Sequence, residues 1–188
     1  MFTLISHLTQ GVKNGVQKSI EGVADISSAV ARSIQDIIMT SFKEGGELIS
    51  EGMNAAASIV QGAISALTHT GKVTLDSVRD IVRSTIEGLT QEGVKGTDAV
   101  RGSIGQAMHQ AKEAGLDLGE VAVIAVKGAI DSAQKTGEDV AALTVHSIET
   151  ALETAETMGA DAYTKVKDTL KRGVDGAEDI VDSLEEKK

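Results

Sequence analysis

Residues 72–159 read KVTLDSVRDIVRSTIEGLTQEG, VKGTDAVRGSIGQAMHQAKEAG, LDLGEVAVIAVKGAIDSAQKTG and EDVAALTVHSIETALETAETMG, four 22-residue blocks laid end to end. Each block ends in a glycine, and these glycines continue a series that comprises Gly71, Gly93, Gly115, Gly137 and Gly159. The eleventh residue of each block is apolar, at Val82, Ile104, Val126 and Ile148. The sequence therefore has a 22-residue period with a finer 11-residue period inside it, and a fixed period of this kind predicts a repeating architecture.

The composition narrows the fold class. The chain has 188 residues, of which 41% are hydrophobic and 24% charged, so it is too apolar for a disordered protein. It contains no proline and no tryptophan, one tyrosine and two phenylalanines. The large side chains that usually fill a globular core are therefore scarce, as is the residue that usually ends helices.

The net charge and the number of cysteines indicate which partners and which cellular compartment to expect. The net charge of −10 argues against binding to nucleic acid, which needs clustered lysine and arginine, and against simple attraction to an anionic membrane. The absence of cysteine fits a reducing compartment, and from their composition we do not expect the first residues, MFTLISHLTQ, to form a signal peptide. We expect a cytoplasmic protein. The longest uncharged run, residues 52–71, carries too many polar side chains for a transmembrane segment.

The apolar residues form one stripe along the whole chain. When the sequence is written in rows of 11 from Met1, places 1, 4, 5, 8 and 9 of the rows hold most of the apolar residues. The only charged residues in those places of the 17 complete rows are Glu92 and Glu185. Three helical turns of about 3.67 residues bring an 11-residue repeat back to the same face, so the pattern predicts an all-α protein.

The phase of this stripe does not change along the sequence. Loops between packed helices are expected to insert residues that ignore the period, so the constant phase predicts one continuous helix over residues 1–188, about 280 Å long. The 22-residue super-repeat is clearest at residues 72–159. The weakest points of the helix, where a bend is expected if there is one, are residues 44–47 and 89–99.

Such a helix needs other helices to bury its stripe. Each of the 20 glycines costs about 1 kcal/mol relative to alanine in a helix, so packing must supply the stability. An 11-residue repeat favours a right-handed supercoil, and a stripe five places wide favours four or more helices around an axis. We therefore expect a homo-oligomeric right-handed coiled coil or α-helical barrel; the sequence leaves its strand orientation open.

In such a barrel the small residues of the stripe would leave an apolar lumen. A lumen of this kind stays dry or takes up apolar guests, and a fatty acid or phospholipid acyl chain has the matching shape. We expect no other cofactor. The residues predicted to line the lumen and bind lipid are Ile59, Val60, Gly71, Val78, Val82, Gly93, Val100, Ile104, Gly115, Ala122, Val126, Gly137, Ile148 and Gly159.

The unbroken 11-residue register resembles that of bacterial right-handed hendecad coiled coils, and the resemblance covers the entire chain. The stretches GVKNGVQKSIEGV at residues 11–23 and LTQEGVKGTDAV at residues 89–100 also resemble the 11-residue helices of synucleins and perilipins, which coat lipid surfaces. Group 3 late-embryogenesis proteins share the period but are far more hydrophilic. The first resemblance implies a coiled-coil assembly and the second a lipid partner, and neither brings catalytic residues.

The sequence carries no pattern typical of an enzyme. The four histidines lie outside the stripe and are widely spaced, and no phosphate-binding GxxxxGK[ST] motif is present. We therefore expect a non-enzymatic protein without a metal site. The favoured hypothesis is the lipid-binding homo-oligomer. The alternatives are an inert structural rod or filament, and a peripheral amphipathic helix that coats a droplet, granule or membrane.

Overall fold

The computed structural model describes residues 2–44 and 51–187. In this part of the chain the protein is all-α, as the 11-residue period predicts. The helices are α1 (Phe2–Ser19), α2 (Ile26–Glu44), α3 (Gly52–His69), α4 (Leu75–Gln91), α5 (Gly96–Glu113), α6 (Leu118–Thr136), α7 (Val140–Met158), α8 (Ala160–Gly173) and α9 (Ala177–Glu186).

The glycine that ends each 22-residue block lies in a turn. Gly115 follows α5 with φ of 71°, a left-handed conformation that glycine adopts without steric cost. The next amide, at Leu116, donates to the carbonyl oxygen of Ala111 at 2.9 Å, which closes the helix end in the Schellman pattern. Positive φ angles are shared by Gly22, Gly71, Gly93, Gly115, Gly137, Gly159 and Gly176. Each 22-residue unit is therefore one helix and one turn.

A capping residue starts the next helix soon after most of these glycines. Thr74 and Ser77 form a reciprocal capping box at the start of α4. The Asp117 carboxylate accepts a hydrogen bond from the Glu120 amide at 3.0 Å at the start of α6. The Lys165 ammonium of α8, 2.6 Å from Asp117, adds a second hydrogen bond and lowers the pKa of that carboxyl below its ordinary value.

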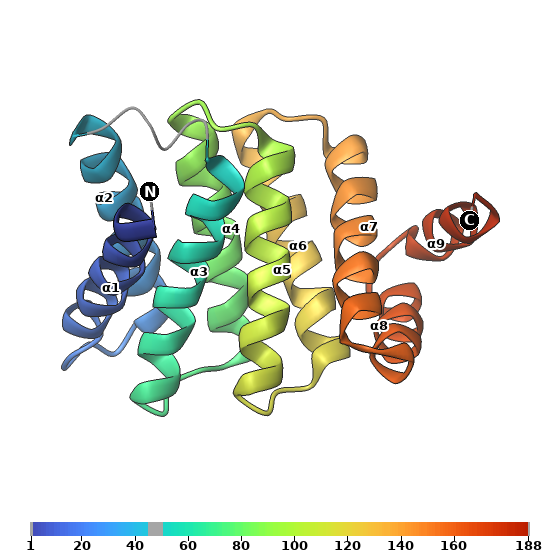
Figure 1. The fold of residues 1–188 in the computed structure, drawn as a ribbon, viewed down its shortest axis with the longest axis horizontal. Coiled ribbons are helices and arrows are strands. Elements are labelled where there is room, and N and C mark those ends of the chain that lie inside the picture. The colour runs from blue at the N-terminus through green and yellow to red at the C-terminus, as the bar shows by residue number, and fades with distance from the viewer. Residues whose placement is uncertain (1, 45–50, 188) are drawn as a thin grey trace.

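The helices form two layers in which successive helices alternate. In one layer α1, α3, α5 and α7 lie side by side, and in the other α2, α4, α6 and α8 do so. Figure 1 shows α3, α5 and α7 next to one another with α4 and α6 behind them. Each helix also packs on its neighbour in sequence across the layers. The array is a helical-repeat stack whose repeating unit is a pair of helices, one from each layer.

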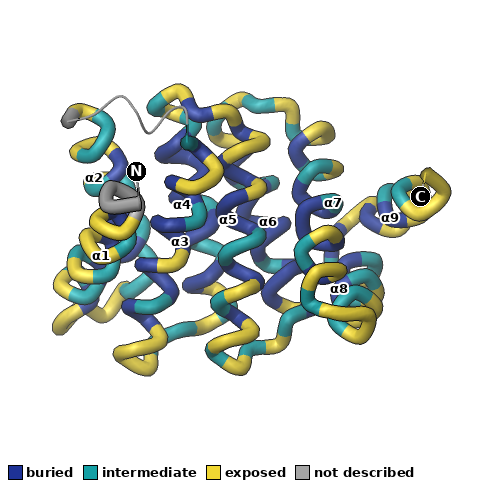
Figure 2. Tube along the Cα trace, in the orientation of Figure 1, coloured by how far each residue is buried: buried dark blue, intermediate teal, exposed yellow. Residues whose placement is uncertain are grey.

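The apolar stripe faces the space between the layers. Ile59, Val60, Val82, Ile104 and Val126 are all at most 1% exposed and belong to one continuous core. Figure 2 shows buried residues through the helices and exposed residues at the loops that join them. Within the helices the stripe was thus predicted at the correct positions, but it is buried within a single chain.

Helix glycines let neighbours within a layer approach closely. A Cβ built on Gly62 of α3 would lie 2.5 Å from the carbonyl oxygen of Thr9 in α1, and one on Gly128 of α6 would lie 2.8 Å from that of Arg79 in α4. Gly102 of α5 contacts the backbone of Met53 in α3 in the same way. These positions accept only glycine at the present spacing, because a side chain would push the two backbones apart.

The single continuous helix over residues 1–188 is not observed. Between residues 51 and 187 the chain reverses direction at glycine-containing turns. One of the expected bends is a turn: α4 ends at Gln91 and α5 begins at Gly96, within residues 89–99. Of the other, 44–47, only Glu44 lies in the described part of the chain, as the last residue of α2.

Candidate functional site

The residues predicted to line a lumen fall into two groups in the structure. The nine with side chains, Ile59, Val60, Val78, Val82, Val100, Ile104, Ala122, Val126 and Ile148, lie on α3 to α7 and fill the core of one chain. The five glycines, Gly71, Gly93, Gly115, Gly137 and Gly159, lie apart from them in the turns. The structure therefore brings the apolar residues together but gives the glycines a different role from the one the sequence indicated.

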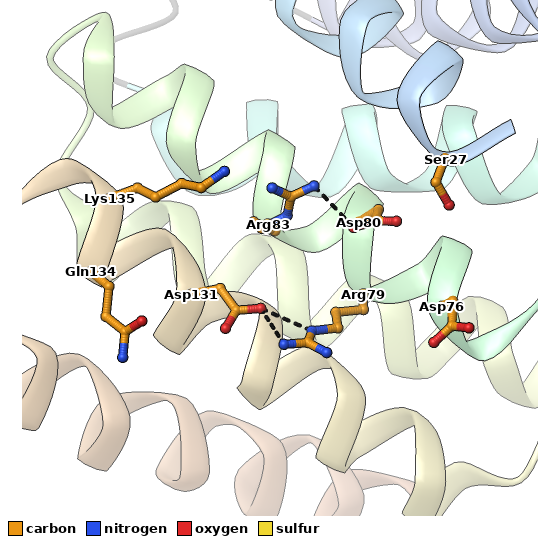
Figure 3. Close-up of a pocket in the computed structure, with 8 residues that line it drawn as sticks. All are labelled: Ser27, Asp76, Arg79, Asp80, Arg83, Asp131, Gln134 and Lys135. Carbon is orange, nitrogen blue, oxygen red and sulfur yellow. Dashed lines mark hydrogen bonds and ion pairs between the residues drawn. The ribbon is translucent and has the colours of Figure 1, made fainter. Parts of the chain in front are cut away.

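A polar groove that sequence reasoning missed crosses the layer formed by α2, α4 and α6. It has a volume of about 570 Å³ and is lined by Ser27, Asp76, Arg79, Asp80, Arg83, Asp131, Gln134 and Lys135. Figure 3 shows Arg79, Asp80 and Arg83 of α4 between the α6 residues on one side and Asp76 with Ser27 of α2 on the other. We call it the α4 groove. Three cations and three carboxylates are interspersed within it.

One ion pair joins α4 to α6 within the α4 groove. The Arg79 guanidinium donates two hydrogen bonds to Asp131 Oδ2, at 2.9 Å from Nε and 2.6 Å from Nη2. The two side chains are 39% and 31% exposed, so water screens their attraction. Along α4, Arg83 donates to Asp80 at 3.0 Å. The charges are thus held in a defined order while remaining accessible.

A buried carboxylate pairs with two cations of the same groove. Glu87 of α4 is 5% exposed, and its Oε1 lies 3.4 Å from Lys135 Nζ and 3.8 Å from Arg83 Nη1. This oxygen accepts no hydrogen bond within the described residues. Burying a carboxylate is costly unless cations compensate it. Glu87 therefore holds Arg83 and Lys135 near the groove by charge, and Lys135 is itself 55% exposed.

The sequence contains a signal for this groove. Asp76, Arg79, Asp80, Arg83 and Glu87 follow one another at helical spacing along α4, which places them on one face. Their pattern alone predicts a solvated helix face. That α2 and α6 would flank this face and add Asp131 and Lys135 depends on the two-layer arrangement, which the continuous-helix interpretation did not contain.

The described residues offer no metal centre, since they contain no group of three or more His, Asp or Glu side chains placed to hold a metal ion. His146 instead links two helices: its Nε2 lies 3.1 Å from the carbonyl oxygen of Thr97. Over the described ranges none of the helices is both long and apolar enough to cross a membrane. The arrangement in the α4 groove is suited to holding charged groups, because cations and carboxylates line it together.

Comparison with known proteins does not assign the chain to a family. No protein-family model matches the sequence, and no curated protein matches it. The resemblance to hendecad coiled coils therefore rests on the sequence period alone.

Proposed function

We propose that this protein is a non-enzymatic helical-repeat scaffold that binds a charged, polar segment of a partner protein in the α4 groove. The observation that carries the proposal is the gathering of charges of both signs from α4 and α6 in one accessible groove. Stacked helical repeats present extended surfaces of this kind to partners. A partner segment that carries both carboxylates and amines would complement Arg79 and Arg83 on one hand and Asp76 and Asp80 on the other.

The energetics support a recognition role for these charges. Exposed ion pairs contribute only about 0–1 kcal/mol to stability, whereas the apolar core between the layers holds α4 and α6 in place. The Arg79–Asp131 pair can therefore exchange its present partners for those of a ligand at small cost to the fold, while Arg83 and Lys135 continue to compensate Glu87. Complementary charges of this kind give specificity and fast association.

The lipid-binding hypotheses use the apolar stripe in a different way. An acyl-filled lumen requires the stripes of four or more chains to meet around an axis, and a lipid coat requires the stripe to face lipid. In the structure Val82, Ile104 and Val126 pack inside one chain instead. This packing favours the scaffold over the acyl-filled lumen and over the lipid coat, because the helical array would have to unfold before its apolar stripe could face other chains or lipid.

Selection from a phage-displayed random peptide library against the purified full chain tests the proposal. The enriched peptides should carry both signs of charge. Exchanging one ion pair of the groove, by Arg79→Asp with Asp131→Arg, keeps the pair but reverses its order, and should weaken binding of the enriched peptides about tenfold or more. Binding is measured by fluorescence anisotropy with labelled copies of the peptides.

A matched control lies in the other layer. Arg101 of α5 and Glu153 of α7 form an exposed ion pair at 3.3 Å between helices that are likewise neighbours within a layer. The exchange Arg101→Glu with Glu153→Arg should leave peptide affinity unchanged. Equal loss in both exchanged proteins, or enrichment of uncharged peptides only, would contradict binding in the α4 groove.

A further inference from the structure

The end of the array formed by α1 and α2 carries a second groove. It has a volume of about 760 Å³, and its apolar lining includes Val23, Ala29 and Ile37. Lys18 and Arg32 supply cations to it, against one carboxylate. We call it the end groove. It is more apolar than the α4 groove, and cations outnumber carboxylates at its walls.

Inside the array, each helix is covered by the next helix of its layer, whereas the surface of α1 and α2 at the end groove has no such neighbour among the described residues. Gly62 of α3 is covered by α1, and Gly102 of α5 is covered by α3. Among the described residues, no atom lies within 4 Å of a Cβ built on Gly11 of α1, which lines the groove. Val23, also in the lining, is 41% exposed. A further element can therefore pack on this end without displacing a helix.

The opposite end of the array carries a helix of complementary charge. Among its ten residues α9 has five carboxylates and no base, whereas α1 has Lys13 and Lys18 and no acid. Figure 1 shows α9 extending away from the layers, and it contacts only α7 and α8 within the described residues.

The surface of α9 has both features that the end groove requires. Asp182 and Glu185 pair with lysines of α8. The exposed carboxylates that remain are Glu178, Asp179 and Glu186. Ile180 and Leu184, one turn apart, are only partly buried, so α9 keeps apolar surface next to its acidic face.

We propose that α9 of one copy docks in the end groove of a second copy. The apolar row of α9 would cover the apolar lining, and its free carboxylates would face Lys18 and Arg32. The two surfaces differ, so the contact is head to tail and repeats from copy to copy, which yields a filament unless the rotation closes a ring. This inference uses different residues from the α4 groove and does not depend on partner binding there.

Charge exchange across the contact tests the proposal. One variant reverses the groove charges by Lys18→Glu with Arg32→Glu, and a second reverses exposed α9 charges by Asp179→Lys with Glu186→Lys. Each should lose self-association, because like charges would then meet. The protein with all four substitutions should regain it. Sedimentation velocity of the full chain at micromolar concentrations measures the mass against 19.5 kDa for one copy.

The outcomes separate this contact from other occupants of the end groove. Wild-type protein should gain mass with concentration, steadily if a filament forms or up to a plateau if a ring closes, and circular dichroism should show all variants equally helical. A wild-type mass that stays at one copy, or no recovery in the fourfold variant, would overturn the proposal. So would an acyl ligand in the end groove, seen as an added mass in native mass spectrometry that the Lys18→Glu, Arg32→Glu protein lacks.

Discussion

Removal of residues 94–115, which contain α5, is expected to abolish cooperative folding, whereas removal of residues 94–137, which contain α5 and α6, should leave a smaller folded protein. Successive helices alternate between the layers, so removing this one unit moves α6 into the present position of α5 beside α3, where Ile124 would replace Gly102 against the backbone of Met53. Removing a pair keeps every later helix in its own layer, and the stability of a stacked repeat protein falls only by one repeat and its interface.

Thermal unfolding followed by circular dichroism measures this difference. The protein without residues 94–137 should show one sigmoidal transition at a lower temperature than the full chain, and the protein without residues 94–115 should show none. Both deletions preserve the 11-residue register, so a continuous 11-residue-repeat helix would tolerate them alike. Equal melting curves for the two would therefore contradict the alternation of layers.

Substitution of Gly102 by alanine is expected to lower the free energy of unfolding by about 2 kcal/mol or more. A Cβ at this position would clash with the carbonyl oxygen of Met53 and lie 2.8 Å from the Ala56 Cβ, so α5 would have to move away from α3. Overpacking of this kind costs about 1–3 kcal/mol, and contact with backbone leaves no flexible side chain to give way. Urea denaturation measures the change.

Gly105, one turn further along α5, supplies the control. A Cβ there would meet Thr154 Oγ1 at 3.6 Å, an ordinary contact, so Gly105→Ala should stabilise the protein by about 0.5–1 kcal/mol through helix propensity. At about 2–4 °C per kcal/mol for a chain of this size, the two variants should differ by several degrees in melting temperature. If Gly102→Ala is as stable as Gly105→Ala, the two helices are not in close contact.

Within the helices the sequence predicted which residues are buried, because that depends on period alone, whereas stripe places in the turns, such as Gly71 and Gly93, are exposed. Helices that alternate between two layers still bury one apolar face each, and places 1, 4, 5, 8 and 9 of the rows locate it at Ile59, Val82 and Ile104. Whether the face is buried against other chains or against the same chain is not encoded in the period. The oligomeric lumen was one of several ways to bury a correctly identified stripe.

The continuous helix was wrong because constant phase does not exclude turns. When a helix and its turn together complete one 22-residue unit, every repetition of the unit preserves an 11-residue register, turns included. The decisive signals were local. A glycine that can end a helix is followed shortly by a capping residue, as in Gly71 with Thr74 and Gly115 with Asp117. These stop and start signals outweigh an unbroken period.

The α4 groove could be predicted only in part. The charges on one face of α4 follow from spacing, but their flanking by Asp131 and Lys135 requires that α6 lie beside α4, with the whole of α5 between them in the sequence. The contact proposed between the end groove and the acidic α9 likewise could not be predicted, because it depends on α1 and α9 lying at opposite ends of one array. Sequence period alone does not order helices in space.

The most direct test of the central claim, that each 22-residue unit folds back as one helix and one turn, is single-molecule energy transfer between residues 101 and 153. The chain has no cysteine, so Arg101→Cys with Glu153→Cys gives two unique labelling sites on exposed side chains. The array places these positions in contact, with Arg101 Nη2 and Glu153 Oε2 3.3 Å apart, and predicts nearly complete transfer within one molecule. A continuous helix would separate them by about 78 Å, and low transfer at picomolar concentration would contradict the fold described here.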